Sequence, residues 1–381
     1  MTRLLVRGGT VLTMEPGDRP QVADVLVDGD TITAVEPGIS ADAEVVDATG
    51  CIVLPGLVDT HRHVWQAGLR GVTGDSVLKD YFRSVRFQAS TIYRPEDVEV
   101  GNHAGMLEAL DAGVTTVLDF SHAIGTADHA HAALAGTRAA GIRSQFALGF
   151  NDVIGQDPAL ATAAGRLALA AQLRGGELAA DDGLVTLGIA LSDLPEVGLE
   201  RITEELTGAR ELGLRSTTNG LAILFHQPVD DLEVFDGAGL LGPDLVWVHL
   251  NHASPEQLRR VAETGGMVAT CPSAEMGMGM GRPATERVLA AGGHCTFGCD
   301  VVTSVSGDLL GQARTALHVA RLLAADERIA SGRAPESVPP TAETLLRGLT
   351  LWGAEALGQD SRIGSLRAGK QADLVVVRPT R

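Results

Sequence analysis

The middle of the chain alternates short apolar runs with longer stretches of helical periodicity. The runs are continuously apolar, which is typical of strands that are buried on both faces of a parallel sheet. Helical stretches separate them, for example at residues 96–112, 200–212 and 255–264. A further apolar-periodic stretch, 341–358, predicts one helix before the last strand. The eight runs are 56–63, 114–120, 142–149, 184–191, 214–219, 245–251, 267–272 and 295–300.

Eight strand-and-helix units in succession predict an α/β fold of the (β/α)8 TIM-barrel type. Both ends of the chain are instead strand-rich. Residues 25–32 resemble a hairpin closed by Asp28-Gly29, and residues 372–377 form another strand pattern. We therefore expect residues 1–54 plus 362–381 to form a small β-sandwich, and residues 55–361 to form the barrel.

Composition narrows the class of protein. Of the 381 residues, 45% are hydrophobic and 20% are charged, so a large core can form. The net charge of −18 argues against nucleic-acid partners, because phosphates would be repelled. No apolar stretch is long enough for a membrane span, and the first residues run into a strand pattern without a signal-peptide cleavage site. We expect a cytoplasmic protein that acts on a small molecule and could form a homo-oligomer.

The four cysteines show no metal-binding or disulfide framework. No two of the cysteines form a C-x-x-C pair, which indicates reduced thiols. The four are Cys51, Cys271, Cys295 and Cys299. Cys295 and Cys299 lie along the eighth run. Because cysteine is among the most buried residue types, they are interpreted as small core residues.

A His-x-His pair ends the first barrel strand. Alternate residues of a strand face the same side, so His61 and His63 point one way and Arg62 the other. The carboxyl ends of barrel strands form the mouth where chemistry takes place. Two imidazoles there can hold one divalent ion. A bare His-x-His is weak evidence, but the preceding residues 54–60, LPGLVDT, give it a specific context.

With this context the sequence resembles the amidohydrolase superfamily, in particular its cytosine-deaminase and chlorohydrolase-like branch. The resemblance rests on residues 55–63, 113–116, 119–122, 298–302 and 364–374, and it covers nearly the whole chain. It implies a metal-containing barrel with a small β-sandwich built from both termini. This agrees with the fold that the hydrophobic pattern predicts.

The resemblance also implies roles for two further strand ends. Asp300, after the eighth strand, would be a carboxylate next to the metal that accepts a proton from its water; the alternative is a turn or helix-capping aspartate. His249, after the sixth strand, would contact the metal or its water and polarise the substrate. The predicted metal ligands are thus His61, His63 and Asp300, and the predicted catalytic residues are Asp300 and His249.

Several other residues follow barrel strands and are candidates for substrate binding. Arg70 could hold a substrate carboxylate through its guanidinium or make a structural ion pair. His252 is either a rim or a surface residue. Three methionines at a spacing of two, Met276, Met278 and Met280, could form an adaptable apolar wall. The full set is Trp65, Gln66, Arg70, His122, Asn219, His252, Glu275, Met276 and Met278.

The fifth strand departs from the family pattern. Asn219 stands where the family has a metal-binding histidine, and Ala222 where its deaminases have a proton-shuttling glutamate. An amide is a poor zinc ligand compared with imidazole, and alanine transfers no proton. Either His226 replaces the ligand, or the metal is held by His61, His63, Asp300 and His249 alone, or the site is poor in metal or free of it.

We therefore expect an amidohydrolase-type hydrolase that attacks a non-peptide C–N bond, in a cyclic amide or an amino-heterocycle, with water activated by one divalent metal. Zinc is the first choice, and iron or manganese are alternatives. A second hypothesis is a non-hydrolytic lyase, dehydratase or cyclase of specialised metabolism on a metal-poor or metal-free barrel. A third is an inactive ligand-binding homologue.

Overall fold

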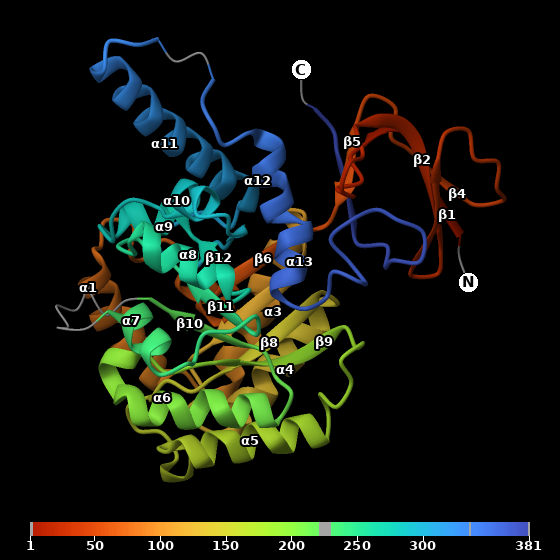
Figure 1. Cartoon of the computed structure of the whole chain (residues 1–381). Coiled ribbons are helices and arrows are strands. Elements are labelled where there is room, and N and C mark those ends of the chain that lie inside the picture. Colours follow the sequence, from red (N-terminus) through yellow and green to blue (C-terminus); the bar gives the residue numbers. More distant parts are fainter. Residues whose placement is uncertain (1–2, 221–229, 335–336, 380–381) are drawn as a thin grey trace.

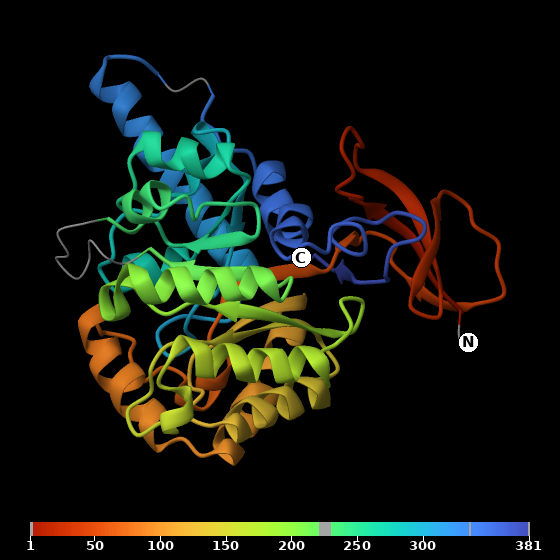
Figure 2. The same ribbon diagram turned by 60° about the horizontal axis from the view of Figure 1, so that its bottom comes forward.

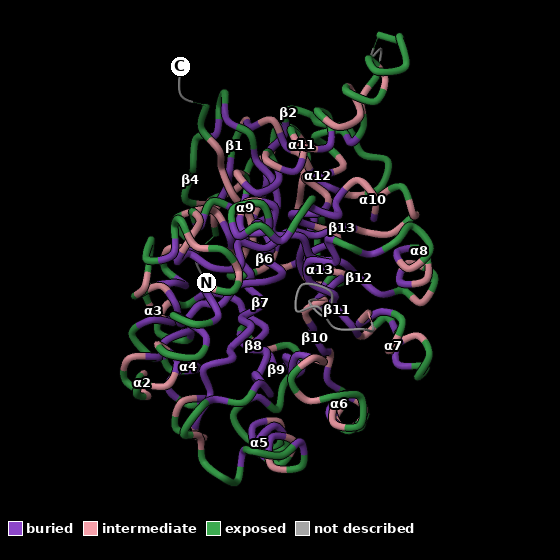
Figure 3. The backbone as a smooth tube through the Cα atoms, turned by 90° about the vertical axis from the view of Figure 1, so that its left-hand side faces the viewer, coloured by how far each residue is buried: buried purple, intermediate pink, exposed green. Residues whose placement is uncertain are grey.

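The computed structural model describes residues 3–220, 230–334 and 337–379. Its main feature is a parallel eight-stranded sheet that is curled into a barrel (Figures 1 and 3). Neighbouring strands follow the order of the chain, as expected when each strand is followed by a helix that returns over the outside. The strands are β6 (Leu57–Arg62), β7 (Val114–Ser121), β8 (Arg143–Gly149), β9 (Val185–Ala190), β10 (Ser216–Asn219), β11 (Leu245–Val248), β12 (Met267–Thr270) and β13 (Cys295–Phe297).

The barrel closes between its first and last strands. Arg62 and Asp300 form a parallel bridge, in which the Asp300 N–H donates to the carbonyl of His61 and the His63 N–H donates to the carbonyl of Asp300, both at 2.9 Å. Gly298 makes this approach possible, because a Cβ there would lie 2.4 Å from the carbonyl oxygen of His61. The closure therefore sets the His-x-His strand directly beside Asp300.

Helices surround the barrel, as Figure 2 shows. Their ends follow local sequence signals. Ser254 begins one helix as a capping box with Gln257, and Gly141 ends another in the left-handed conformation (φ 72°). The helices are α1 (Leu78–Tyr81), α2 (Ser90–Ile92), α3 (Pro95–Asp111), α4 (Ala127–Ala140), α5 (Ala163–Gly175), α6 (Leu194–Glu211), α7 (Asp231–Gly237), α8 (Pro255–Glu263), α9 (Pro272–Gly277), α10 (Thr285–Ala290), α11 (Leu309–Ala330), α12 (Ala342–Leu349) and α13 (Leu351–Ala356), with 3-10 turns η1 (Val64–Leu69) and η3 (Pro158–Leu160) and the π-helical segment η2 (Phe82–Ala89).

The two ends of the chain share a second, mixed sheet that stands to one side of the barrel (Figure 1). Its order is β14–β5–β1–β2–β3, and β4 pairs with β1. The predicted hairpin is β2 to β3, and Gly29 supplies the positive φ that its tight turn needs. The strands are β1 (Arg3–Val11), β2 (Gln21–Asp28), β3 (Thr31–Glu36), β4 (Glu44–Asp47), β5 (Ile52–Pro55) and β14 (Leu374–Val377).

The predicted fold class is confirmed, with all eight barrel strands found at the expected runs. One element differs. Residues 341–358 form two helices, α12 and α13, because Thr350 leaves helical geometry (φ −131°, ψ −90°) and its hydroxyl donates to the carbonyl of Leu346. Cys295 and Cys299 are buried free thiols, as expected. Within the described residues, no helix is long and apolar enough to cross a membrane.

Candidate functional site

The two histidines of the His-x-His pair lie at the carboxyl end of β6, fully or almost fully buried. The Nδ1 of His63 lies 2.9 Å from the carbonyl oxygen of Phe120. Since a carbonyl only accepts hydrogen bonds, Nδ1 carries the proton and the lone pair of Nε2 is free. That Nε2 lies 3.4 Å from Oδ1 of Asp300, and the Nε2 of His61 lies 3.3 Å from the same oxygen.

A third imidazole reaches the same carboxylate from β11. The Nε2 of His249 lies 4.0 Å from Oδ2 of Asp300. The ring centroids of His61 and His249 are 5.5 Å apart. The barrel therefore brings His61, His63, His249 and Asp300 together, as the sequence predicts for three strand ends at one mouth.

Backbone strain marks the same place. His249 and Asp300 both have positive φ (75° and 61°), a conformation that costs a side-chain-bearing residue energy. Only two other non-glycine residues in the described part of the chain share it, and one of them is the adjacent Leu250. Strain of this kind persists where the surrounding structure holds it for a function. It turns both side chains into the mouth directly after their strands end.

The protonation states suit a cation. Burial lowers the pKa of His61, and burial together with the neighbouring His61 lowers the pKa of His63 to about 3. Both rings are therefore neutral near pH 7. Burial raises the pKa of Asp300, but the imidazoles that face this carboxylate outweigh burial and lower the pKa to about 2. Two neutral imidazoles and an ionised carboxylate are the ligand forms that zinc binds.

Glu275 of α9 supports His249 from behind. Its Oε1 lies 3.2 Å from Nδ1 of His249, and its Oε2 accepts a hydrogen bond from Asn251. The carboxylate also accepts from the backbone N–H of Cys271 and is fully buried. Burial lowers the pKa of His249, but the hydrogen bond that its ring donates to Glu275 and the charge of Asp300 outweigh burial and raise that pKa. Glu275 thus orients His249 so that Nε2 faces Asp300.

These residues fit a divalent cation. The ligand atoms of His61, His249 and Asp300 lie within 4.8 Å of one another, and neither ring nitrogen of buried His61 has a hydrogen-bond partner among the described residues. A cation would satisfy one of these nitrogens. A second cluster, His249, Cys271 and Glu275, fits less well. Burial raises the pKa of the Cys271 thiol, which holds it in the protonated form, and Glu275 already bonds three groups.

A cavity opens beside the cluster, and several predicted substrate-binding residues surround it. The Nε1 of buried Trp65 donates to Nδ1 of His122, which leaves the proton of that ring on Nε2. Gln66 donates to the hydroxyl of Tyr81 on α1. The residues that line the cavity are His63, Leu78, Tyr81, Phe82, Arg86, His122, Asp193, Asn219, His249, Met278, Met280 and Asp300.

Asn219 faces this cavity from the end of β10, where the fifth barrel strand ends. Its Nδ2 donates to Oδ1 of Asp193 at 3.0 Å, while its buried Oδ1 has no partner among the described residues. Asp193 comes from the end of the preceding strand, β9, and also accepts from Asn151. Burial raises the pKa of Asp193. A carboxyl group thus enters the site beside Asn219, from one strand earlier than the family pattern suggests.

Six of the nine predicted substrate-binding residues do not line the cavity. Trp65, Gln66 and Glu275 lie behind it and bond residues that do line it. Arg70 is half exposed and pairs with Glu108, so of the two predicted roles the structure shows the ion pair. His252 is exposed, and its Nε2 bonds the carbonyl of Met280. Met276 is 40% exposed. Two residues of the sequence argument, Ala222 and His226, lie outside the described residues.

Sequence reasoning missed Asp193, Arg86 and Tyr81 as cavity residues. Asp193 carried a usable signal, because it lies two residues after the fourth apolar run. Arg86 and Tyr81 carried none, because they lie 18 or more residues after the His-x-His pair, in a segment without strand or motif character. Their position depends on how α1 and η2 fold back over the mouth.

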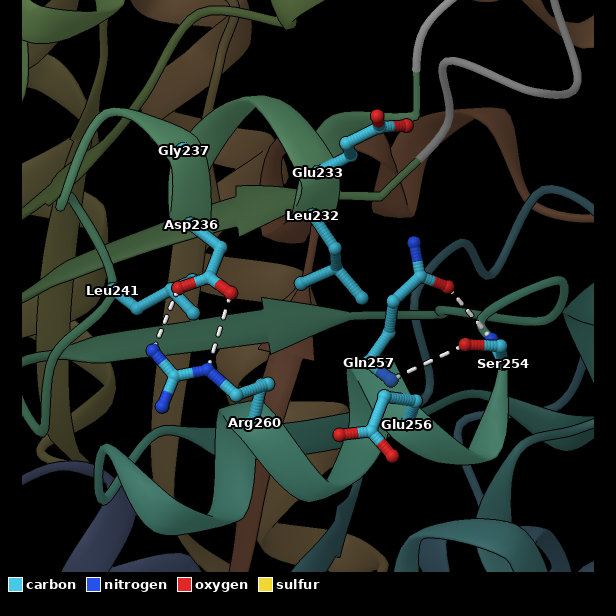
Figure 4. A pocket seen from close by; sticks show the side chains of 9 residues that line it. All are labelled: Leu232, Glu233, Asp236, Gly237, Leu241, Ser254, Glu256, Gln257 and Arg260. Atoms are coloured by element: carbon cyan, nitrogen blue, oxygen red, sulfur yellow. Dashed lines mark hydrogen bonds and ion pairs between the residues drawn. The ribbon is translucent and has the colours of Figure 1, made fainter.

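A separate hollow lies outside the barrel, between α7 and α8 (Figure 4). Several of its polar groups already have structural partners. The Arg260 guanidinium binds both oxygens of Asp236, and Ser254 and Gln257 cap α8. None of the four clustered site residues lines it. The barrel mouth is therefore the candidate active site.

Comparisons with known proteins find relatives along most of the chain. A 5-methylthioadenosine/S-adenosylhomocysteine deaminase of Natronomonas pharaonis is 32% identical over 388 residues, which cover 99% of this chain and 84% of that protein. A probable guanine deaminase of Deinococcus radiodurans is 29% identical over 361 residues, 89% of this chain and 76% of that protein. Among solved structures, a zinc-bound adenosine deaminase from Xanthomonas campestris has a TM-score of 0.85 at 25% identity, covering 99% of this chain and 85% of its own.

The family assignment rests on a match along almost the whole chain. The model of the amidohydrolase family matches residues 52–380, from the last strand before the barrel to the end of the terminal sheet. The predicted resemblance is confirmed by this match: the chain belongs to the amidohydrolase family.

Proposed function

We propose that the protein is a metal-dependent hydrolase that removes the amino group from an amino-substituted heterocycle. The observation that carries this is the buried cluster of His61, His63, His249 and Asp300 at the barrel mouth, where the backbone of His249 and Asp300 is strained. The relatives support the reaction type, since those compared above are named as deaminases of adenine- or guanine-containing compounds. Their substrates are starting points for screening.

His61, His63 and Asp300 would hold the ion, with His249 beside it. Zinc is our choice, because one solved relative contains it. A divalent cation in such a site lowers the pKa of water toward neutrality and so supplies a nucleophile. Nothing in the donor set favours iron or manganese over zinc.

The reaction adds one water across the C–N bond. The oxygen of water bonds to the ring carbon, the C–N bond breaks, and the amino nitrogen leaves as ammonia. Asp300, ionised at neutral pH, accepts a proton from the attacking water. His249, whose Nε2 faces the same point, stabilises the charge that develops on the substrate.

The leaving nitrogen needs a proton that Ala222 cannot supply. We assign this step to Asp193, which lines the cavity and is bonded to the amide groups of Asn151 and Asn219. Burial raises its pKa, so the carboxyl holds a proton more readily than an exposed aspartate. We expect Asp193→Asn to abolish ammonia release while the bound metal remains; full turnover in this variant would remove Asp193 from the mechanism.

The test begins with metal analysis of protein purified without chelator. About one zinc per chain, together with ammonia release from a panel of aminopurines, aminopyrimidines and adenine nucleosides, would support the proposal. His63→Ala should lose both the metal and the activity. An active, metal-free His63→Ala protein would exclude this mechanism.

A second candidate is a non-hydrolytic lyase, dehydratase or cyclase, and the sequence at Asn219 and Ala222 favours it. The discriminating observation is the product. Turnover is run in ¹⁸O-labelled water and the product is analysed by mass spectrometry. A product that contains the labelled oxygen supports the hydrolase. A product without solvent oxygen, formed equally with and without added zinc, supports the second candidate. Tight ligand binding without turnover would indicate an inactive homologue.

A further inference from the structure

Arg86 places a buried positive charge in the wall of the active-site cavity. It lies on the π-helical segment η2, which follows the His-x-His strand and α1 in the chain. The side chain is 2% exposed, and it lines the same cavity as His63 and Asp300.

The guanidinium is only partly bonded. Its Nη2 donates to the carbonyl of Asp152 at 3.0 Å, which fixes the end of the side chain. Its Nε and Nη1 are buried without a hydrogen-bond partner among the described residues. Buried charged donors that lack partners are costly, so donors of this kind that face a cavity are ready to bond a ligand there.

Arg166 shows how this chain satisfies a structural buried arginine. It is fully buried on α5, and it donates five hydrogen bonds, four to backbone carbonyls and one to Gln156. Arg86 makes one such bond. A purely structural role therefore does not account for its position.

Two acidic residues, Asp193 and Asp300, share the cavity wall with Arg86. Asp193 and Arg86 interact through their charges, but the two oxygens of Asp193 accept hydrogen bonds from the amides of Asn151 and Asn219. In the part of the chain that the structure describes, Arg86 forms no ion pair. The cavity thus offers two free N–H donors of a cation beside the reacting groups.

We propose that Arg86 binds a carboxylate that the substrate carries close to the bond that reacts. The inference deepens the proposed function, since it places the anion in the same cavity as the metal-binding cluster. The substrate would then be a small heterocycle with its own carboxylate, held by Arg86 at one end and presented to Asp300 and His249 at the other. A carboxylate fits better than a phosphate, because a dianion would face the carboxylate of Asp300, which lines the same cavity.

The test uses a matched pair of probes, nicotinate and nicotinamide, which differ only in carboxylate against neutral amide. Their affinities for the zinc-loaded protein are measured by calorimetry. We expect Arg86→Gln to weaken nicotinate binding roughly tenfold or more and to leave nicotinamide binding unchanged, since hydrogen bonds to charged groups are worth more than neutral ones. Arg86→Lys, which keeps the charge, should retain part of the preference for nicotinate.

Arg83→Gln is the control variant. Arg83 lies on the same segment but is exposed and pairs with Asp80, so the same change of charge there should alter neither affinity. Thermal melting and zinc content of each variant report on the fold and on the metal site.

Three results would overturn the proposal. The first is that the parent protein shows no preference for nicotinate. The second is that Arg86→Gln loses affinity for both probes equally. The third is that this variant still binds nicotinate, because the metal alone holds the carboxylate. Tighter binding of inorganic phosphate than of nicotinate would contradict the choice of carboxylate. Because binding is measured without turnover, absence of ammonia release would count against the proposed function and leave this inference standing.

Discussion

At the scale of single residues, the site depends on the groups that orient the histidines as much as on the histidines themselves. His63 is fixed by the carbonyl of Phe120 and His249 by the carboxylate of Glu275, both through Nδ1. Each therefore offers Nε2 to the space around Asp300. Partners of this kind set the tautomer and the ring orientation, so their loss affects a site that they never touch.

Glu275→Gln tests this support. The amide keeps the size of the side chain but removes the charge that raises the pKa of His249, and its NH2 group cannot accept from every present donor. We expect kcat to fall by about 10- to 100-fold with a smaller change in KM. The measurement is steady-state kinetics with zinc content as a second readout. Glu286→Gln, at a partly exposed residue paired with Arg282, is the control; equal kinetics in both variants would contradict the role of Glu275.

Asn219→His tests whether the fifth strand still faces the metal. Asn219 lines the cavity with His249 and Asp300, so an imidazole there should add a ligand to the cluster. We expect zinc affinity to rise by roughly tenfold or more, measured by competition with a chelator. Asn219→Ala, which removes the amide without adding a ligand, should show no gain. A histidine variant with unchanged affinity would place position 219 outside the reach of the ion.

At the scale of elements, the barrel and its chemistry depend on how the first and last strands meet. Hydrophobic runs predicted all eight strands, because strands buried on both faces have few polar positions. The runs could not give the exact ends: the sixth and eighth strands stop at Val248 and Phe297, and His249 and Asp300 then turn inward with positive φ. Such strain comes from tertiary contacts, and no local pattern encodes it.

The segment between β6 and α3 was the least predictable part of the site. It carries Tyr81 and Arg86 on the short α1 and the π-helical η2, which are not the regular long helices of a barrel. The orientation of the His-x-His pair, by contrast, could be predicted. Alternate side chains of a strand face the same side, so the position of the pair at a strand end determines where both rings point. Residues on regular strands were thus predicted, and residues on irregular segments that fold over the mouth were not.

Gly298→Ala tests the junction of β13 with β6. A Cβ there would lie 2.4 Å from the carbonyl oxygen and 2.8 Å from the Cβ of His61, so one of the two strands must move. We expect the free energy of unfolding to fall by about 1–3 kcal/mol and zinc affinity to fall with it. Chemical denaturation and zinc titration check both. Gly175→Ala on α5, where a Cβ meets nothing within 4 Å, is the control; it should be neutral or slightly stabilising.

At the scale of the whole molecule, the terminal sheet and the barrel are joined near the amino-terminal ends of the barrel strands, away from the mouth. The Arg143 guanidinium, at the start of β8, pairs with Asp373, one residue before β14, at 2.9 Å. The sequence predicted that the two termini meet in one module, because both ends are strand-rich. It could not predict this ion pair, whose partners are 230 residues apart.

The ion pair of Arg143 and Asp373 allows the stability of the protein to be tested separately from its activity. The side chain of Arg143 is 5% exposed, so Asp373→Asn would leave a buried charge without its counterion, which typically costs about 3–5 kcal/mol of stability. We expect thermal and chemical unfolding to show a loss of that order, while zinc content and kcat at 25 °C stay unchanged. The control is Asp28→Asn, which removes an exposed pair with Arg3 and should cost at most about 1 kcal/mol. If Asp373→Asn instead lost zinc or activity along with stability, the terminal sheet would be coupled to the barrel mouth. The sheet would then contribute to activity as well as to stability.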